Sequence, residues 1–380
     1  MDLKFNSSEF PTIGAELELQ LIDPATRNLT SAAINVLKEC RERQFDRIKK
    51  EIHQSMIELD TPICQSVKEC RAHLNHALVE LTDIAGSLNL RVAISGTHPF
   101  QKWTDRQFFP AARYLFIHRK YRWLAKRINV YGLHVHVGVE NGDEAIRISN
   151  AMIRYLPFLL ALSASSPYWG GEHTGVSSCR IGIMECFPYS GIPPHFSNWK
   201  EFSSYYNLLR QTQAITSLKD LYWHVRPNPM FGTLEFRICD GMPTLSETAA
   251  LIALTQSLVK WAKEDKNMGT SSSMHQFDRL VAPENLWRAA RDGLKAMLII
   301  DENGQCRPII DEIRTLLETL EPVAMELDCR EELSFIHNII NNGTSADRQR
   351  NVFRNTKDLV SVVDSLIEEL QTDTYVQSFK

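Results

Sequence analysis

Paired cysteines, long apolar runs and an excess of one charge are all missing from this sequence of 380 residues. Its eight cysteines include no C-x-x-C pair, and several lie in apolar contexts, as reduced buried thiols do. No apolar run approaches the roughly 20 residues that span a bilayer, and no signal-peptide pattern opens the chain. Lysine and arginine total 42 against 46 aspartate and glutamate, so no broad cationic face is expected for nucleic acid or anionic lipid. We expect a cytoplasmic protein with neither a nucleic-acid nor a membrane partner.

The common nucleotide-binding loops are missing as well. No G-x-x-x-x-G-K-[ST] occurs, which excludes a P-loop, and no strand-linked G-x-G-x-x-G occurs, which excludes a Rossmann site. Hydrophobic residues make up 43% of the chain, enough for a large buried core. Any nucleotide site in this protein must therefore be built in another way.

Apolar and polar residues alternate in four segments, and stretches of helical period lie between and after them. These patterns predict an α+β fold. Strands are expected at residues 12–23, 51–61, 91–95, 131–139 and 233–238. Helices are expected at 31–50, 65–89, 106–128, 143–165 and 199–219, and from 244 onward with breaks at 267–273 and 341–345. Residues 166–198 show no sustained period and are expected to form a long loop, typical of a lid or site wall.

Each of the four alternating segments carries two polar residues on one strand face. The pairs are Glu16/Glu18, Glu58/Asp60, His134/His136 and Glu235/Arg237. A single such strand is equally typical of a sheet with one solvated face. If the four strands are neighbours in one antiparallel sheet, however, their shared face holds at least four carboxylates, two imidazoles and one guanidinium group.

Crowded carboxylates repel one another and raise one another's pKa unless a cation neutralises them. Carboxylate-rich sites with one or two imidazoles favour Mg²⁺ or Mn²⁺, whereas structural zinc would require thiolates that these segments lack. Magnesium in a protein commonly accompanies phosphate. The remaining interpretation is an ATP site built on a sheet face with metal ions and arginines.

Motifs along nearly the whole chain resemble one known family. They are GAELELQLID (14–23), EIHQSMIELDTP (51–62), GTHPF (96–100), GLHVHVGV (132–139), TLEFRICD (233–240), PENLWRAARDG (283–293) and GTSADRQR (343–350). In this order they resemble the carboxylate-amine ligases of the type 2 glutamate-cysteine ligase family and, more distantly, glutamine synthetase. The resemblance implies a curved, mainly antiparallel sheet that forms an active-site funnel, with helices on its outer face. It further implies one ligase domain over residues 1–380, in which a core (1–265) is completed by a helical C-terminal region (266–380).

The resemblance also implies roles for individual residues. The positions that hold metal ions are matched by Glu16, Glu18, Glu51, Glu58, His134 and Glu235. Glu235 and Arg237 match catalytic positions, with Arg237 on the transferred phosphoryl group. His136 is expected to face nucleotide or substrate, although the two histidines could exchange roles. Further nucleotide or substrate contacts are expected from His98, Arg113, Tyr114, Arg226, Asn285 and Arg288. The planar guanidinium group of Arg226 would suit a substrate carboxylate, although a structural loop arginine fits its segment equally well. For Asn285 and Arg288, which lie at helical spacing, the sequence alone indicates helix packing.

The expected reaction is ATP-dependent amide formation through an acyl phosphate, with glutamate as the acid and cysteine as the amine. The expected cofactor is Mg²⁺ or Mn²⁺, with ATP as co-substrate, and a homo-oligomer such as a dimer is left open. Two alternatives stay open at this point. One is a metal-dependent hydrolase of the amidohydrolase type, which also uses an H-x-H strand, and the other is a binding protein that keeps the fold without catalysis.

Overall fold

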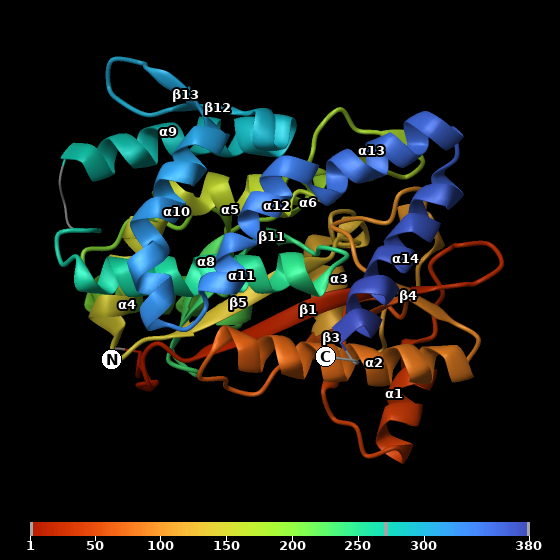
Figure 1. Ribbon diagram of the computed structural model, residues 1–380. Helices are drawn as coiled ribbons and strands as arrows, with labels where there is room; N and C mark the ends of the chain where they lie inside the picture. Colours follow the sequence, from red (N-terminus) through yellow and green to blue (C-terminus); the bar gives the residue numbers. More distant parts are fainter. Residues whose placement is uncertain (1–2, 270–272, 378–380) are drawn as a thin grey trace.

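The computed structural model describes residues 3–269 and 273–377 (Figure 1). The strands are β1 (Ile13–Ile22), β2 (Ile48–Lys50), β3 (Met56–Asp60), β4 (Arg91–Ala93), β5 (Gly132–Gly138), β6 (Tyr168–Trp169), β7 (Glu172–His173), β8 (Ser190–Gly191), β9 (Tyr222–Trp223), β10 (Val225–Asn228), β11 (Thr233–Asp240), β12 (Met297–Ile299) and β13 (Cys306–Pro308). The helices are α1 (Ala33–Glu42), α2 (Val67–Ser87), α3 (Ala112–Tyr121), α4 (Gly142–Met152), α5 (Leu156–Ser163), α6 (Cys179–Glu185), α7 (Trp199–Gln211), α8 (Leu245–Glu264), α9 (Ser273–Asp292), α10 (Ile309–Glu326), α11 (Arg330–Ser334), α12 (Ile336–Asn342), α13 (Ser345–Thr356) and α14 (Leu359–Gln377).

A seven-stranded sheet forms the centre of the molecule. Its strand order is β10-β11-β5-β1-β3-β2, with β4 also paired to β1, and every pairing is antiparallel. The four strands with polar faces are consecutive in this order, so the prediction that they are neighbours in one antiparallel sheet is confirmed. The amidohydrolase alternative would require a β/α barrel, and the described residues form this open sheet instead.

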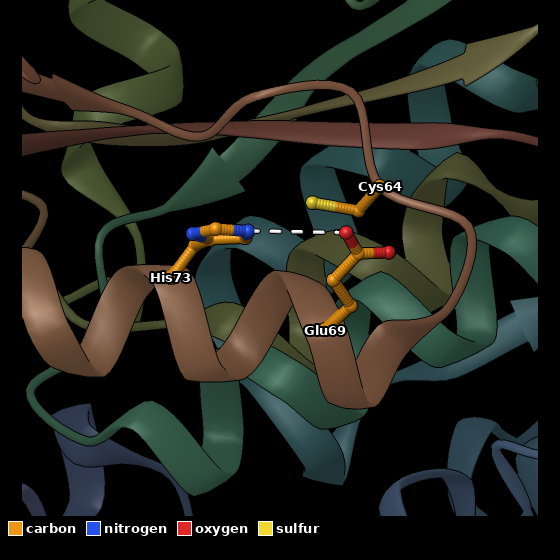
Figure 2. Close-up of side chains that lie close together, drawn as sticks. All are labelled: Cys64, Glu69 and His73. Carbon is orange, nitrogen blue, oxygen red and sulfur yellow. Dashed lines mark ion pairs between the residues drawn. The ribbon is translucent and has the colours of Figure 1, made fainter.

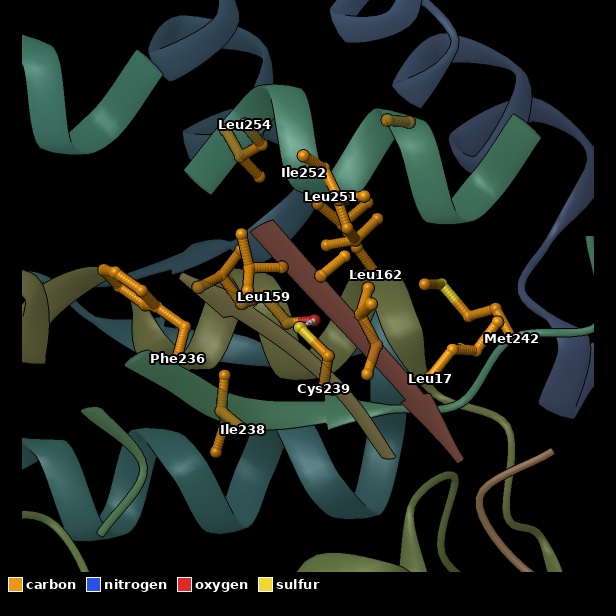
Figure 3. Close-up of a cluster of buried hydrophobic side chains, with 14 of the residues drawn as sticks. Leu17, Leu159, Leu162, Phe236, Ile238, Cys239, Met242, Leu251, Ile252 and Leu254 are labelled. Atoms are coloured by element: carbon orange, nitrogen blue, oxygen red, sulfur yellow. Dashed lines mark hydrogen bonds between the residues drawn. The ribbon is translucent and has the colours of Figure 1, made fainter. Parts of the chain in front are cut away.

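The apolar face of the sheet packs against helices to form the main core. Leu17 and Phe236 project from neighbouring parts of the sheet and meet leucines of α5 and α8, as Figure 3 shows. The Cys239 thiol approaches the Leu159 carbonyl oxygen in the same cluster. Because side chains alternate along a strand, burying this face turns Glu16, Glu18 and the other paired polar residues to the opposite face.

A continuous helical run, Gly142–Ser163, passes through this core. It is long and apolar enough to cross a membrane by length and composition alone, although Arg147 and Arg154 interrupt its apolar residues. Of its most apolar 18-residue stretch, 78% is buried inside the protein. Within the run, α5 packs on α9 and β11. Every residue of α5 is buried, as expected for a helix that passes through a protein core.

Several predicted elements have different bounds. The helix predicted at 31–50 ends at Glu42. Two residues later, Gln44 has a positive φ of 59°, which does not continue a helix. Ile48 of β2 then pairs with Leu59 of β3. The helix predicted at 106–128 is confined to α3 and a short turn. The predicted loop at 166–198 contains α6, and the predicted helical region after 244 contains the hairpin β12–β13 around Gly304, whose φ is 78°.

The helices after residue 265 pack back onto the core. α10, α11 and α12 contact α8, and α14 contacts β4 and α2. In Figure 1 these helices form the blue layer over the sheet and α8. The division of the chain at residue 265 stays a prediction.

Candidate active site

The register of β1 with its two neighbours brings acidic and imidazole side chains together. Glu16 lies opposite His134 on β5, and Glu18 lies opposite Glu58 on β3. Residues directly opposite each other in an antiparallel pair point to the same face. The His134 Nδ1 atom is accordingly 3.0 Å from the Glu16 Oε2 atom.

On the other side of β5, β11 adds a carboxylate and a guanidinium group. Glu235 lies opposite His136, and the register then shifts between Phe236 and Cys239. Arg237 stands within this irregularity, where a bulge redirects a side chain. Its Nη1 atom donates to Glu235 and lies 3.3 Å from the His134 Nδ1 atom.

The result is three overlapping groups of potential metal ligands. In each group, one ligand atom per residue lies within 4.8 Å of the others. The groups are Glu18/Glu51/Glu58, Glu16/Glu58/His134 and Glu16/His136/Glu235. Glu58 belongs to the first two groups and Glu16 to the last two, so the groups form a continuous row across four strands. All six residues predicted to hold metal occur in this row, which also includes His136; both histidines are therefore placed to act as ligands.

At the β3 end of the row, the buried carboxylate of Glu18 and the half-buried carboxylates of Glu51 and Glu58 crowd together. Burial, followed by the charge of Glu18, raises the pKa of Glu51 to about 7. Burial and the charges of Glu51 and Glu16 raise the pKa of Glu58 well above its ordinary value. Burial also raises the pKa of Glu18, against the opposing charge of Arg180. These crowded carboxyl groups can all be ionised only if a nearby cation offsets the repulsion between them.

At the β11 end, the protein supplies that charge itself. Burial alone would raise the pKa of Glu235, but the guanidinium groups of Arg226 and Arg237 outweigh burial and lower it. The pKa of Glu16 is likewise lowered, because the adjacent imidazoles of His134 and His136 outweigh its burial. The pKa of His134 falls to about 4 through burial and the charge of Arg237, so this imidazole is neutral near pH 7.

One buried atom in the row has no hydrogen-bond partner among the described residues. It is His136 Nε2, which lies 3.3 Å from the Glu16 Oε1 atom without hydrogen-bond geometry, while His136 Nδ1 contacts the Thr233 hydroxyl at 3.1 Å. A buried unpaired nitrogen costs free energy unless a ligand satisfies it. Together with the carboxylates, it gives a donor set that fits divalent cations.

The guanidinium group of Arg226 has no free pair of N–H donors for a substrate carboxylate. Its Nη2 and Nε atoms donate to Glu235, and its Nη1 atom donates to the carbonyl oxygens of Leu218 and Leu221 at 3.1 and 2.8 Å. The side chain is buried and its donors are used within the protein. In this structure Arg226 holds Glu235, and its predicted role in substrate binding stays a prediction.

His98 is also used within the protein. Its Nε2 atom contacts the Arg27 carbonyl oxygen at 2.8 Å, and its Nδ1 atom accepts hydrogen bonds from the backbone N–H groups of Phe100 and Gln101. Burial lowers its pKa to about 3. This fully buried, neutral imidazole stabilises its loop, and the prediction that it contacts nucleotide or substrate does not agree with these contacts.

Arg113 and Tyr114, both on α3, make different contacts. Arg113 pairs with the buried Asp220 at 3.2 Å and donates to the Lys219 carbonyl oxygen, so these donors are used within the protein. Tyr114 donates its hydroxyl to the Lys50 carbonyl oxygen at 2.8 Å, next to Glu51. Burial and the charge of Glu51 raise the pKa of this phenol. Tyr114 thus lies at the edge of the row, and Arg113 does not.

Asn285 and Arg288 hold the hairpin β12–β13 to α9. The Asn285 amide exchanges hydrogen bonds of 3.0 and 2.9 Å with the backbone of Ile299, and Arg288 contacts Glu284 and the Met297 carbonyl oxygen. These contacts fit helix packing, the other interpretation of this pattern. They hold both side chains at the hairpin and not at the ligand row, where the resemblance had led us to expect them.

Two cationic residues near the row, Arg180 and Lys49, were not predicted from the sequence. Arg180 of α6 is buried, and its guanidinium group occupies the space that a side chain on Gly132 would fill: a Cβ there would lie 2.2 Å from Nη2. It donates to the carbonyl oxygens of Ile238 and Arg237. Lys49 on β2 lies opposite Glu58 on β3, and its amino group pairs with the Asp60 carboxylate. The glycine at the start of GLHVHVGV was the only signal for Arg180, because its own segment looked like a loop.

Comparison with known proteins identifies relatives over almost the full length. The family model described as "Glutamate-cysteine ligase family 2 (GCS2)" matches residues 12–365. A protein of Thermobifida fusca named "Putative glutamate–cysteine ligase 2" is 39% identical over 375 residues, covering 98% of this chain and 94% of that protein. A protein of Frankia casuarinae named "Putative glutamate–cysteine ligase 2-1" is 40% identical over 377 residues and covers 98% of both chains.

Solved structures share the fold at much lower identity. A glutamate–cysteine ligase of Francisella tularensis, crystallised with AMP, aligns with a TM-score of 0.65 at 14% identity, covering 99% of this chain and 95% of that one. A bifunctional glutathione synthetase of Pasteurella multocida gives the same TM-score and identity, covering 96% of this chain and 53% of that one. The predicted sheet-based ligase fold is therefore confirmed.

Proposed function

The chain belongs to glutamate-cysteine ligase family 2, and on that premise we propose that it joins the γ-carboxylate of glutamate to the amino group of cysteine at the expense of ATP. Membership makes the protein an ATP-dependent ligase that acts on small molecules with the help of a divalent metal. The names of the relatives support glutamate and cysteine as the substrates, and the positions of the side chains support the roles of the individual site residues.

The observation that carries the proposal is the row of three overlapping ligand groups on one sheet face. The groups fit Mg²⁺ or Mn²⁺, because their donors are mostly carboxylate oxygens with one imidazole in two of the groups. Such ions, when bound, shield the charge of the triphosphate and polarise the transferred phosphoryl group. Glu16, Glu18, Glu51, Glu58, His134, His136 and Glu235 would hold them.

We assign Arg237 to the transferred phosphoryl group. Its guanidinium group lies against both Glu235 and His134, which belong to different ligand groups, so it borders the space between two candidate ions. The Glu235 charge and the backbone bulge fix its position before substrate arrives. A fixed guanidinium group stabilises charge that spreads over the phosphoryl oxygens during transfer.

The reaction then has two balanced steps. An oxygen of the glutamate γ-carboxylate attacks the terminal phosphorus of ATP, the bond to ADP breaks, and a γ-glutamyl phosphate forms. The cysteine nitrogen attacks the acyl carbon, the carbon–oxygen bond to phosphate breaks, and the nitrogen gives up a proton to complete the amide. Arg226 holds Glu235, and the Arg180 guanidinium group lies against Gly132 on the ligand face of β5, near Glu18, so both act as positioning residues.

We further propose a cytoplasmic location, since ATP and cysteine with a free thiol occur together in a reducing compartment. A homodimer stays a prediction. The direct test is an ADP-release screen of amino-acid pairs with Mg²⁺, run with and without cysteine. We expect ADP release to require both glutamate and cysteine. Equal release with other acids in place of glutamate would contradict the substrate assignment but leave the ligase chemistry in place.

A further inference from the structure

A second cluster of metal-ligating side chains lies outside the ligand row. Cys64, in the loop before α2, and Glu69 and His73, in the first two turns of α2, place one ligand atom each within 4.8 Å of the others. Figure 2 shows the three side chains pointing toward one another. The Glu69 Oε1 and His73 Nε2 atoms are 3.8 Å apart.

The cluster lies on the helix-covered side of the sheet. Leu74 and Leu78 of α2 are buried in the same core as Leu17, whereas Glu69 and His73 are on the outer surface of the helix. The ligand row occupies the opposite sheet face. The two sets therefore use different residues and different faces of the fold.

The backbone around the cluster is firmly held. Cys64 and Ile13 exchange backbone hydrogen bonds of 2.8 and 2.9 Å at the start of β1. Ser66 caps α2 by accepting a hydrogen bond from the Glu69 N–H group, and the Gln65 N–H group donates to Glu69 Oε2 at 2.7 Å. The second carboxylate oxygen is thereby fixed, which leaves Glu69 Oε1 directed toward His73.

Sulfur distinguishes this cluster from the ligand row. The Cys64 thiol is fully buried and donates a hydrogen bond to the Pro62 carbonyl oxygen at 3.3 Å. A thiolate, an imidazole and a carboxylate together suit zinc and similar borderline-soft ions, whereas Mg²⁺ takes oxygen ligands. A tetrahedral zinc ion keeps its ligand atoms about 3.4 to 3.7 Å apart. Side-chain movements of about 1 Å would close the present set around such an ion.

We propose that Cys64, Glu69 and His73 bind one zinc ion, or a similar thiophilic divalent ion, at a site separate from the catalytic face. The ion would link the loop before α2 to the second turn of that helix and, through the Cys64–Ile13 backbone pair, to the first strand of the sheet. It leaves one coordination position for water or for a second thiol. The proposal is independent of the ligase reaction.

Cobalt spectroscopy of the full-length protein tests it. The protein is stripped with a chelator, supplied with excess Mg²⁺ to occupy the oxygen-rich sites, and titrated with Co²⁺, which accepts the same ligands as zinc. We expect one equivalent of Co²⁺ to produce a thiolate-to-cobalt charge-transfer band, and one equivalent of Zn²⁺ to remove it. Absence of this band in the unmodified protein would overturn the proposal.

Variants identify the ligands. Cys64→Ser should abolish the band, and His73→Ala should weaken Co²⁺ binding by at least about tenfold, since even indirect partners of a metal site contribute that much. Cys306→Ser, which alters an exposed thiol on β13, is the matched control and should leave the titration unchanged. Retention of the band in Cys64→Ser, or unchanged affinity in His73→Ala, would contradict the assignment. Because His73 is exposed, His73→Ala answers the question even if Cys64→Ser does not fold.

Discussion

Arg226 and Glu235 face each other across β10 and β11 and form a buried two-point ion pair. The Arg226 Nη2 atom lies 2.8 and 2.7 Å from the two Glu235 carboxylate oxygens, and the Nε atom lies 3.2 Å from Oε2. Both side chains are almost fully buried. The pair fixes a carboxylate that belongs to one ligand group and also contacts Arg237.

Removing one partner of this pair should destabilise the protein strongly. We expect Arg226→Met to lower the free energy of unfolding by about 3–5 kcal/mol, because Glu235 would then lack one of its two compensating charges in a buried position. Urea unfolding of the metal-free protein measures this. Arg119→Lys, on the exposed side of α3, is the control and should change stability little. A loss below about 1 kcal/mol for Arg226→Met would mean that Arg237 alone neutralises Glu235.

Arg237→Lys separates a transition-state role from simple charge. The lysine keeps the positive charge but loses the planar fork. We expect kcat to fall by about 10² or more, with a smaller change in the KM for ATP, as when a preorganised charge-stabilising donor is lost. Steady-state kinetics with saturating Mg²⁺ measure both constants. A kcat within about threefold of the unmodified enzyme, under 1 kcal/mol, would make Arg237 a structural residue.

Because two ligand groups share Glu58, we expect glutamate-to-glutamine variants to differ in the Mg²⁺ concentration that gives half-maximal activity. Glu58 belongs to two ligand groups and Glu51 to one, so Glu58→Gln should raise the Mg²⁺ concentration for half-maximal activity more than Glu51→Gln does. Glu18→Gln should behave like Glu51→Gln. Activity titrations with Mg²⁺ give the three values, with Glu140→Gln on the exposed surface as control. Equal values for Glu58→Gln and Glu140→Gln would remove Glu58 from the metal site.

The buried imidazoles predict a loss of stability in acid. The pKa of His98 is about 3 in the folded protein, lowered by burial from an ordinary value of 6.5. The unfolded chain therefore binds a proton that the folded protein excludes, so this contribution to stability is complete above pH 6.5 and is lost as pH falls toward 3. Between pH 6.5 and 5 the loss from this residue is about 2 kcal/mol.

His98→Gln should remove that part of the pH dependence. Urea unfolding at pH 7 and pH 5 compares the two proteins, and the difference between the two pH values should shrink by about 2 kcal/mol in the variant even if its stability at pH 7 is lower. His53, whose pKa burial also lowers to about 3, should supply a similar and separate contribution. An identical pH dependence in His98→Gln would show that His98 accepts a proton without unfolding.

Sequence periodicity predicted the faces of the strands well and the partners of individual side chains poorly. Alternation placed Glu16, Glu18, His134 and Glu235 on polar faces, and these faces do meet in one sheet because the opposite faces share one core. A face, however, does not reveal which donors are already used. Arg226 and His98 are satisfied by carbonyl oxygens of Leu218 and Arg27, which no local pattern connects to them.

Short elements were the other source of error. The hairpin β12–β13 has three residues in each strand, too few for a period to appear, and its only signal was the turn near Gly304. Arg180 was missed for the same reason, since α6 has seven residues within a segment rich in glycine, serine and proline. Its position against Gly132 depends on tertiary packing, which the local sequence does not encode.

The most direct test of the ligase assignment follows one oxygen atom. Glutamate labelled with ¹⁸O in its γ-carboxylate is incubated with cysteine, ATP, Mg²⁺ and the enzyme, and the inorganic phosphate is analysed by mass spectrometry. Attack of the carboxylate on ATP, followed by displacement of phosphate, transfers one labelled oxygen to each phosphate formed. We predict γ-glutamylcysteine, ADP and singly labelled phosphate in equal amounts. Unlabelled phosphate, or amide formed without ATP, would contradict the acyl-phosphate mechanism.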